Sequence, residues 1–227
     1  MPEWWTYRPE DFLLFAPRVY WRMFELHNEA YWPLQGLFLA GLMGAVVLGF
    51  RRSALQSLWI GGLFALAWAF AGWFFLWQRY AGINWAAGYV APLFGVQATL
   101  LLGAGCAGAL TFVTKGRIFA ASGFLALGGF FYPLLALLYG RPITLAEVFG
   151  LMPDPTAVAT LGLAIAGSGR WTGVLLPIPV LWLLASAATL HTMGDDQFRV
   201  PLVAAIAAVF LFFLRLLFRP RAQERQP

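Results

Sequence analysis

Long apolar stretches, separated by short segments that carry charges, glycines or prolines, recur along most of the chain. A run of about 18 or more apolar residues is long enough to cross the hydrocarbon core of a bilayer as a helix. The pattern therefore predicts an all-α fold, a polytopic transmembrane helix bundle of about seven spans. The spans are expected at residues 32–50, 54–77, 86–114, 118–139, 155–168, 171–190 and 201–218.

Residues 1–31 precede the spans and are aromatic and charged instead of uniformly apolar. Charged residues recur there at helical spacing and fall on one face: Arg18, Arg22, Glu25 and Glu29. The opposite face carries Tyr20, Phe24 and Tyr31. We therefore expect an amphipathic helix that lies in the membrane interface, with Pro17 in its first turn.

Basic residues gather in alternate loops and at the end of the chain. They are Arg51, Arg52, Lys115, Arg117, Arg170, Arg215, Arg219, Arg221 and Arg225. The positive-inside rule places these loops in the cytoplasm, so the N-terminus is expected outside and the C-terminus inside. The chain then divides into an interfacial segment (1–31), a membrane domain (32–218) and a basic cytoplasmic tail (219–227).

The composition agrees with a protein that is embedded in a lipid bilayer. Hydrophobic residues make up 61% of the chain and charged residues 11%, whereas soluble domains carry about 25% charged residues. The net charge of +5 does not point to nucleic acid, because the basic residues lie in loops between apolar runs. The single cysteine, Cys106, lies in an apolar run and has no partner for a disulfide or a thiolate metal site. We expect no cofactor.

The fifth expected span is unusually short. Residues 156–168 give a helix of about 20 Å, against a hydrocarbon core of about 30 Å. Either residues 148–152 complete the crossing, or the helix begins below the outer surface with Asp154 as its N-cap and Pro155 at N1. A sunken helix start can bind polar ligands, as it does at the broken helices of transporters. An ordinary capped helix is the alternative.

Three segments stand out as motifs. They are Trp4-Trp5-Thr-Tyr-Arg-Pro-Glu-Asp-Phe-Leu-Leu-Phe, Ile83-Asn-Trp-Ala-Ala with Gln97 downstream, and Pro153-Asp-Pro-Thr-Ala-Val-Ala-Thr-Leu-Gly. Together they resemble an uncharacterised family of bacterial polytopic membrane proteins, a domain of unknown function. The family pattern has Cys between the two prolines where this chain has Asp154, so a thiol role does not transfer. The resemblance implies a multi-pass protein of the bacterial inner membrane and supplies no activity.

Polar residues near the third and fifth spans form a candidate substrate path. The set is Gln97, Asp154, Thr156, Asn84, Arg79 and Arg141. Gln97 falls near the middle of the third span, where an amide is costly and either bonds a neighbouring helix or lines a polar path. Asn84 and Arg79 lie at the outer end, where anchoring at the surface explains them equally well. A polar pocket between Thr156 and Gln97 is the geometric expectation.

Two histidines on the expected outer face form a second candidate site. His27, His191 and Asp195 offer imidazole and carboxylate ligands for a divalent metal. Their spacing matches no HxxxH or HExxH pattern. His27 also falls on the aromatic face of the expected amphipathic helix, where packing is the alternative role.

Three functional hypotheses follow. The first is a permease-like or channel-like protein for a small polar or ionic solute, entered near the fifth span. The second is an accessory or assembly subunit of a larger membrane complex, with a membrane protein or a second copy as its partner. The third is a metal-dependent enzyme or metal-handling protein at the outer face. The sequence contains no P-loop, GxSxG or CxxC motif, which favours a role that is not enzymatic.

Overall fold

The computed structural model describes residues 15–51, 53–112, 116–167 and 171–218, and this part of the chain is almost entirely helical. The expected tail, residues 219–227, and most of the tryptophan-rich first motif lie outside the described residues. The longer helices are α1 (Pro17–Gly49), α2 (Ala54–Phe70), α3 (Trp85–Cys106), α4 (Gly116–Phe131), α6 (Pro153–Ala166), α8 (Pro177–Thr192) and α9 (Arg199–Leu217). The shorter helices are η3 (Ala71–Trp77), η4 (Tyr80–Gly82), α5 (Leu134–Leu138), η5 (Ile143–Leu145), α7 (Trp171–Leu175) and η6 (Asp196–Phe198).

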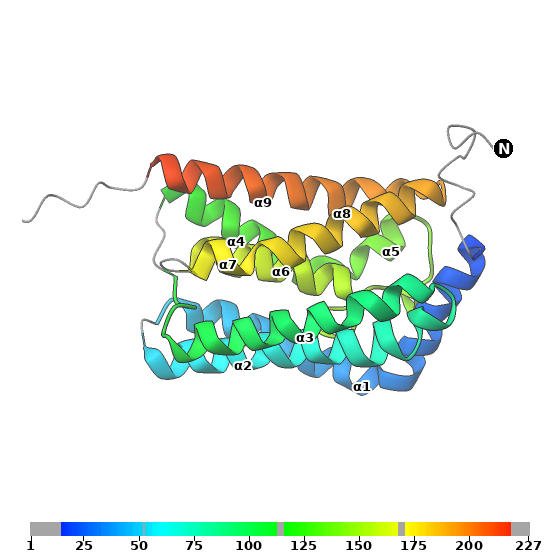
Figure 1. The fold of residues 1–227 in the computed structure, drawn as a ribbon, viewed down its shortest axis with the longest axis horizontal. Coiled ribbons are helices and arrows are strands. Elements are labelled where there is room, and N and C mark those ends of the chain that lie inside the picture. Colours follow the sequence, from blue (N-terminus) through cyan, green and yellow to red (C-terminus); the bar gives the residue numbers. More distant parts are fainter. Residues whose placement is uncertain (1–14, 52, 113–115, 168–170, 219–227) are drawn as a thin grey trace, which may run out of the picture.

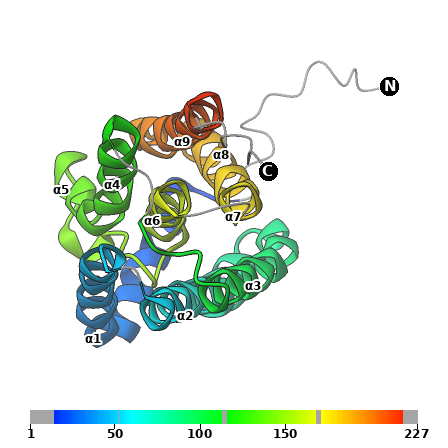
Figure 2. The same cartoon turned by 90° about the vertical axis from the view of Figure 1, so that its left-hand side faces the viewer.

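The helices run along one axis and surround α6. Helices α1, α2 and α3 form one side of the bundle, and α8, α9, α4 and α5 form the other (Figure 1). Viewed along the axis, α6 lies at the centre with the other helices around it (Figure 2). In Figure 1, α6 begins inward of the end at which α8 ends and α9 begins. The short helix is therefore the core of the bundle.

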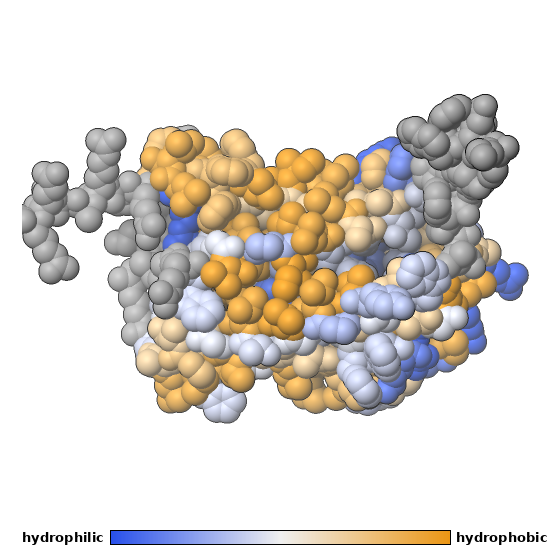
Figure 3. All heavy atoms as spheres, in the orientation of Figure 1, coloured by the Kyte–Doolittle hydropathy of each residue, from blue (hydrophilic) through white to orange (hydrophobic). Residues whose placement is uncertain are grey.

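Among the residues that the structure describes, five helices are long and apolar enough to cross a membrane. They are Pro17–Gly49, Ala54–Gly82, Trp85–Cys106, Trp171–Thr192 and Asp196–Leu217. Large apolar side chains are exposed on the outside of the bundle, among them Phe124, Leu138 and Leu217, each more than 75% exposed. Hydrophobic residues cover much of the visible face along its middle, and hydrophilic residues gather at the end near the start of α1 (Figure 3). Such a surface is suited to lipid, because soluble proteins rarely expose large contiguous apolar patches.

Two of the expected span boundaries differ from the structure, one near a glycine and the other at a proline. The third expected span was to reach residue 114, but α3 ends at Cys106 because Gly108, just beyond, has a φ of +68°. Glycine adopts this left-handed conformation readily and ends helices for that reason. The fourth expected span is divided into α4 and α5, with Pro133 between them as the N-cap of α5.

Helix α1 bends after its first half. Tyr31 has non-helical angles (φ −123°, ψ 19°), and Pro33 follows. Before the bend, the aromatic face of α1 packs into the bundle, where the ring of Phe24 lies 4.9 Å from that of Phe75 and Tyr20 lies 5.8 Å from Tyr80. The face expected to lie in the membrane interface is thus covered by η3 and η4.

The central position of α6 depends on a close contact with α4. Every residue from 146 to 167 is buried, which includes the non-helical chain before α6 and the whole of the helix. A Cβ atom on Gly162 would lie 2.4 Å from the backbone nitrogen of Ala126 in α4. Only glycine permits this approach, because helix backbones in membranes come close where small residues face each other.

We expect Gly162→Ala to lower the melting temperature of the purified protein strongly. The added methyl group meets backbone atoms of α4, so α4 and α6 must separate, and overpacking of this kind costs about 1–3 kcal/mol. Gly123→Ala on α4 is the matched control, because a Cβ there has no atom within 4 Å. Equal melting temperatures for both variants would contradict the contact.

Candidate functional site

A buried carboxylate, Asp154, lies in the first turn of α6. Helix α6 begins at Pro153 with Met152 as its N-cap, so Asp154 is not the N-cap expected from the sequence. Asp154 Oδ1 accepts a hydrogen bond from Trp182 Nε1 (2.7 Å). Its Oδ2 accepts from Ser186 Oγ (2.6 Å) and from the Tyr132 hydroxyl (3.3 Å).

All three donors to Asp154 are neutral. Trp182 and Ser186 lie one turn apart on α8, and Tyr132 lies between α4 and α5. Asp154 forms no ion pair with any described residue. The positive end of the α6 dipole also favours a negative charge at this position. A proton can therefore join or leave this carboxyl without breaking an ion pair.

Threonine side chains satisfy the backbone around the start of α6. Thr156 Oγ1 accepts from the Gly150 N–H (2.8 Å) and donates to the Met152 carbonyl (2.6 Å). One turn later, Thr160 Oγ1 accepts from Trp68 Nε1 (2.8 Å). Buried backbone groups need hydrogen-bond partners, and Thr156 supplies them to Gly150 and Met152 at the start of α6.

The other end of α6 is held by a positive charge. Arg215 of α9 donates to the carbonyl oxygens of Ile165 and Gly167 and to Thr172 Oγ1, the last at 2.9 Å. Thr172 Oγ1 in turn donates to the Ala164 carbonyl (2.9 Å). A cation at a helix C-terminus complements the dipole. Helix α6 thus has a carboxylate at its start and a guanidinium at its end.

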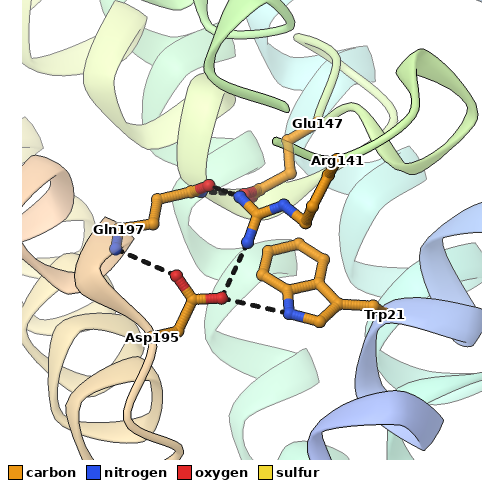
Figure 4. A network of polar contacts seen from close by, with 5 residues as sticks. All are labelled: Trp21, Arg141, Glu147, Asp195 and Gln197. Atoms are coloured by element: carbon orange, nitrogen blue, oxygen red, sulfur yellow. Dashed lines mark hydrogen bonds and ion pairs between the residues drawn. The ribbon is translucent and has the colours of Figure 1, made fainter. Parts of the chain in front are cut away.

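A second polar cluster, the outer network, joins three segments at the end of the bundle near the start of α6. It consists of Trp21, Arg141, Glu147, Asp195 and Gln197 (Figure 4). Arg141 Nη1 donates to Asp195 Oδ2 (2.7 Å), and the Arg141 side chain is 13% exposed. The guanidinium carbon lies 3.6 Å from the centroid of the Trp21 ring, and Trp21 Nε1 also donates to Asp195. The network ties α1 to the chain after α5 and to the turn before α9.

Glu147 lies at the inner side of this network. Gln197 Nε2 donates to Glu147 Oε1 (2.6 Å), and Arg141 donates to the Gln197 amide oxygen. Glu147 is 5% exposed and forms no ion pair within the described residues. The Gln197 amide therefore bridges the buried Glu147 carboxyl to Arg141.

The side chain of Asn28 fixes the chain that leads to Glu147. Its Nδ2 atom donates to the carbonyl oxygens of Thr144 and Ala146, at 2.8 Å each. Gln35 Nε2 donates to Asn28 Oδ1 (2.9 Å). Asn28 therefore fastens α1 to the buried segment before α6.

The residues of the expected substrate path do not form one group. Gln97 Nε2 donates to the Leu175 carbonyl of α7 (3.1 Å), so Gln97 bonds a neighbouring helix. The rings of Trp68 and Trp182 lie 4.5 and 5.3 Å from that of Phe94, one turn before Gln97. The interior beside Gln97, where a polar pocket was expected, is packed with aromatic rings.

The remaining path residues have separate roles. Asn84 is the N-cap of α3, where its side chain accepts from the Ala86 N–H (3.1 Å). Arg79 lines a groove at the end of the bundle. Arg141 belongs to the outer network, where it pairs with Asp195. Asp195 is one of the three residues expected from the sequence as metal ligands.

The three expected metal ligands lie in different surroundings. His27 is fully buried, and its ring lies 4.8 Å from that of Tyr31. His191 packs on Phe198 at 4.7 Å. Asp195 accepts from Arg141 and Trp21. Within the described ranges, no group of three His, Cys, Asp or Glu residues gathers in a way that could hold a metal.

Sequence reasoning missed most partners of the two acidic groups. Trp182 and Ser186 are four residues apart, which places them on one face of a helix, and this spacing was the available signal. Nothing in the local sequence marks Gln197 or Arg215, because their partners are distant along the chain.

Comparison with known proteins identifies a family. The model of a family of unknown function (DUF6064) matches residues 17–223. No curated protein and no solved structure matches the chain. The matched range contains Asp154 and its three donors, the outer network and Arg215.

Proposed function

The chain belongs to DUF6064, a family of unknown function, and we propose that it is a permease-like or channel-like membrane protein for a small ionic solute. Asp154 is the group that binds the ion, and the proton is the simplest candidate for it. A buried carboxyl with only neutral donors, at the start of a short central helix, is the observation that supports this proposal. Ionisable groups inside a membrane are costly and usually mark ion pathways.

The packing around α6 supports movement of the solute by a change of conformation. Helix α6 is 14 residues long, about 21 Å, and the buried chain before it is held by hydrogen bonds that can be exchanged. Discontinuous helices of this kind place their ends at the binding sites of transporters. The outer network then closes the outer end in the state described here, since it joins three segments there.

The topology that goes with this function is the one expected from the sequence. We propose that α4 with α5, and α6 with the buried chain before it, complete a bundle of about seven spans. The N-terminus lies outside and the C-terminus inside, in the bacterial inner membrane. The outer network would then face the exterior and Arg215 the cytoplasm.

A proton-flux assay tests the proposal. Purified protein is reconstituted into liposomes that contain a pH-sensitive dye, and a potassium diffusion potential drives proton entry. We expect the wild type to acidify the lumen faster than protein-free liposomes do, and Asp154→Asn to reduce the rate to that of protein-free liposomes. The reason is that asparagine keeps the size of the side chain and cannot bind the proton.

The matched control removes a carboxylate at the surface. Asp196 pairs with Arg199, and both side chains are about two-thirds exposed. Asp196→Asn should leave the flux unchanged. The proposal is wrong if Asp154→Asn conducts as the wild type does, or if the wild type is no faster than protein-free liposomes.

An apolar groove favours an accessory subunit as the second candidate function. The groove has a volume of about 860 Å³ and lies between α4, α5 and α9. Gly128, Ala204 and Ala207 line it, and small residues let another helix approach closely. Purification in mild detergent should then bring down a stoichiometric partner from wild-type cells, and less of it from Ala207→Phe cells. If neither the wild type nor the variant brings down a partner, this second candidate function is wrong.

A further inference from the structure

A basic groove lies at the end of the bundle, between the first half of α1 and the chain around η4. Its volume is about 780 Å³. The charged residues that line it are Arg18, Arg22, Arg79 and Glu25, so three positive charges and one negative charge give a formal net charge of +2. Apolar side chains form much of the rest, among them Met23, Leu26, Ile83 and Leu145.

Two of the three arginines are available to an anion. Arg22 forms an ion pair with Glu25, one turn along α1. Arg18 is exposed and Arg79 is half-buried, and neither side chain forms an ion pair or a hydrogen bond with another residue in the part of the chain that the structure describes. The groove therefore presents two uncompensated guanidinium groups beside an apolar wall.

Aromatic residues place the groove at the depth of lipid headgroups. Trp77 and Trp85 are 50% and 67% exposed, and they flank the segment 78–83 that forms one wall. Tryptophan is enriched at the membrane–water interface because its ring is amphipathic. Hydrophilic residues gather at this same end of the molecule, beyond the apolar middle (Figure 3). The phosphates of the adjoining leaflet lie at the level of such a belt.

We infer that the basic groove binds the headgroup of an anionic phospholipid. Arg18 and Arg79 bind the phosphate, because a guanidinium matches phosphate oxygens with paired hydrogen bonds. An acyl chain of the same lipid lies along Met23, Leu26 and Leu145. This inference concerns a surface separate from Asp154, so it stands or falls independently of ion transport.

Native mass spectrometry of the full-length protein in detergent tests the inference. The probes are phosphatidylglycerol, phosphatidylcholine and glycerol 3-phosphate. We expect the wild type to bind phosphatidylglycerol more tightly than phosphatidylcholine. The double variant Arg18→Gln, Arg79→Gln should bind phosphatidylglycerol about 30-fold more weakly, because each arginine near an anionic surface contributes about 1 kcal/mol.

Two further double variants distinguish the effect on lipid affinity of charges in the groove from the effect of charges elsewhere on the protein. Arg18→Lys with Arg79→Lys keeps the charges but loses the paired hydrogen bonds, so its affinity should lie between those of the wild type and the glutamine variant. Arg51→Gln with Arg199→Gln removes two exposed arginines outside the groove and should bind as the wild type does. Unchanged affinity of the Arg18→Gln, Arg79→Gln variant, or no preference of the wild type for phosphatidylglycerol, would overturn the inference. Glycerol 3-phosphate that binds as tightly as the lipid would also overturn it, in favour of a soluble phosphate ester.

Discussion

Replacing Arg215 with glutamine is expected to lower the free energy of unfolding by about 3 kcal/mol. Arg215 donates to the carbonyl oxygens of Ile165 and Gly167 and to the hydroxyl of Thr172. Hydrogen bonds from a charged donor contribute about 1.5–3 kcal/mol each, and part of that is recovered by water at a half-buried site. Equilibrium unfolding in mild detergent, or the shift of the melting temperature, measures the loss.

The control for Arg215 lies at the other end of the same helix. Arg199 of α9 pairs with Asp196 at 2.8 Å, but both side chains are about two-thirds exposed. Ion pairs at the surface contribute at most about 1 kcal/mol, so Arg199→Gln should change stability little. If the two variants lose the same stability, Arg215 is an ordinary surface charge and does not hold the end of α6.

The existence of the helices was predictable from the sequence because it depends on local pattern. Apolar runs of sufficient length can satisfy their backbone in a bilayer only as helices, so α2, α3 and α9 follow from composition. The ends were less predictable. Gly108 ends α3 through its positive φ, and Pro133 divides α4 from α5, whereas the apolar pattern continues through both positions.

The unusual length of α6 was also visible in the sequence, but its surroundings were not. Asp154 stood out because a carboxylate among apolar residues is rare. Its donors Trp182 and Ser186 lie on α8, and which face of α8 meets α6 depends on the packing of the whole bundle. Arg215 was read as a topology signal, since a basic residue at the end of the last span has that meaning in most membrane proteins.

The ion pair between Arg141 and Asp195 is expected to contribute a coupling free energy of about 2 kcal/mol in a double-mutant cycle. The cycle uses Arg141→Gln, Asp195→Asn and the double variant, with the free energy of unfolding as the readout. Their side chains are 13% and 16% exposed, so the pair is screened little by water. Arg141 also lies over the Trp21 ring, which fixes the guanidinium in place.

The pair formed by Arg199 and Asp196 is the comparison that isolates burial as the cause. The donor–acceptor distances are nearly equal, 2.7 Å in the outer network and 2.8 Å at the surface, while the exposed pair has side chains 65% and 66% accessible. If distance alone mattered, both cycles would give the same coupling. We expect the exposed pair to couple by less than about 0.5 kcal/mol and to lose that coupling when the salt rises from about 0.1 M to about 1 M. The buried pair should keep most of its coupling, because salt ions cannot approach it. If the coupling of the buried pair also vanished at high salt, the outer network would not close this end of the bundle.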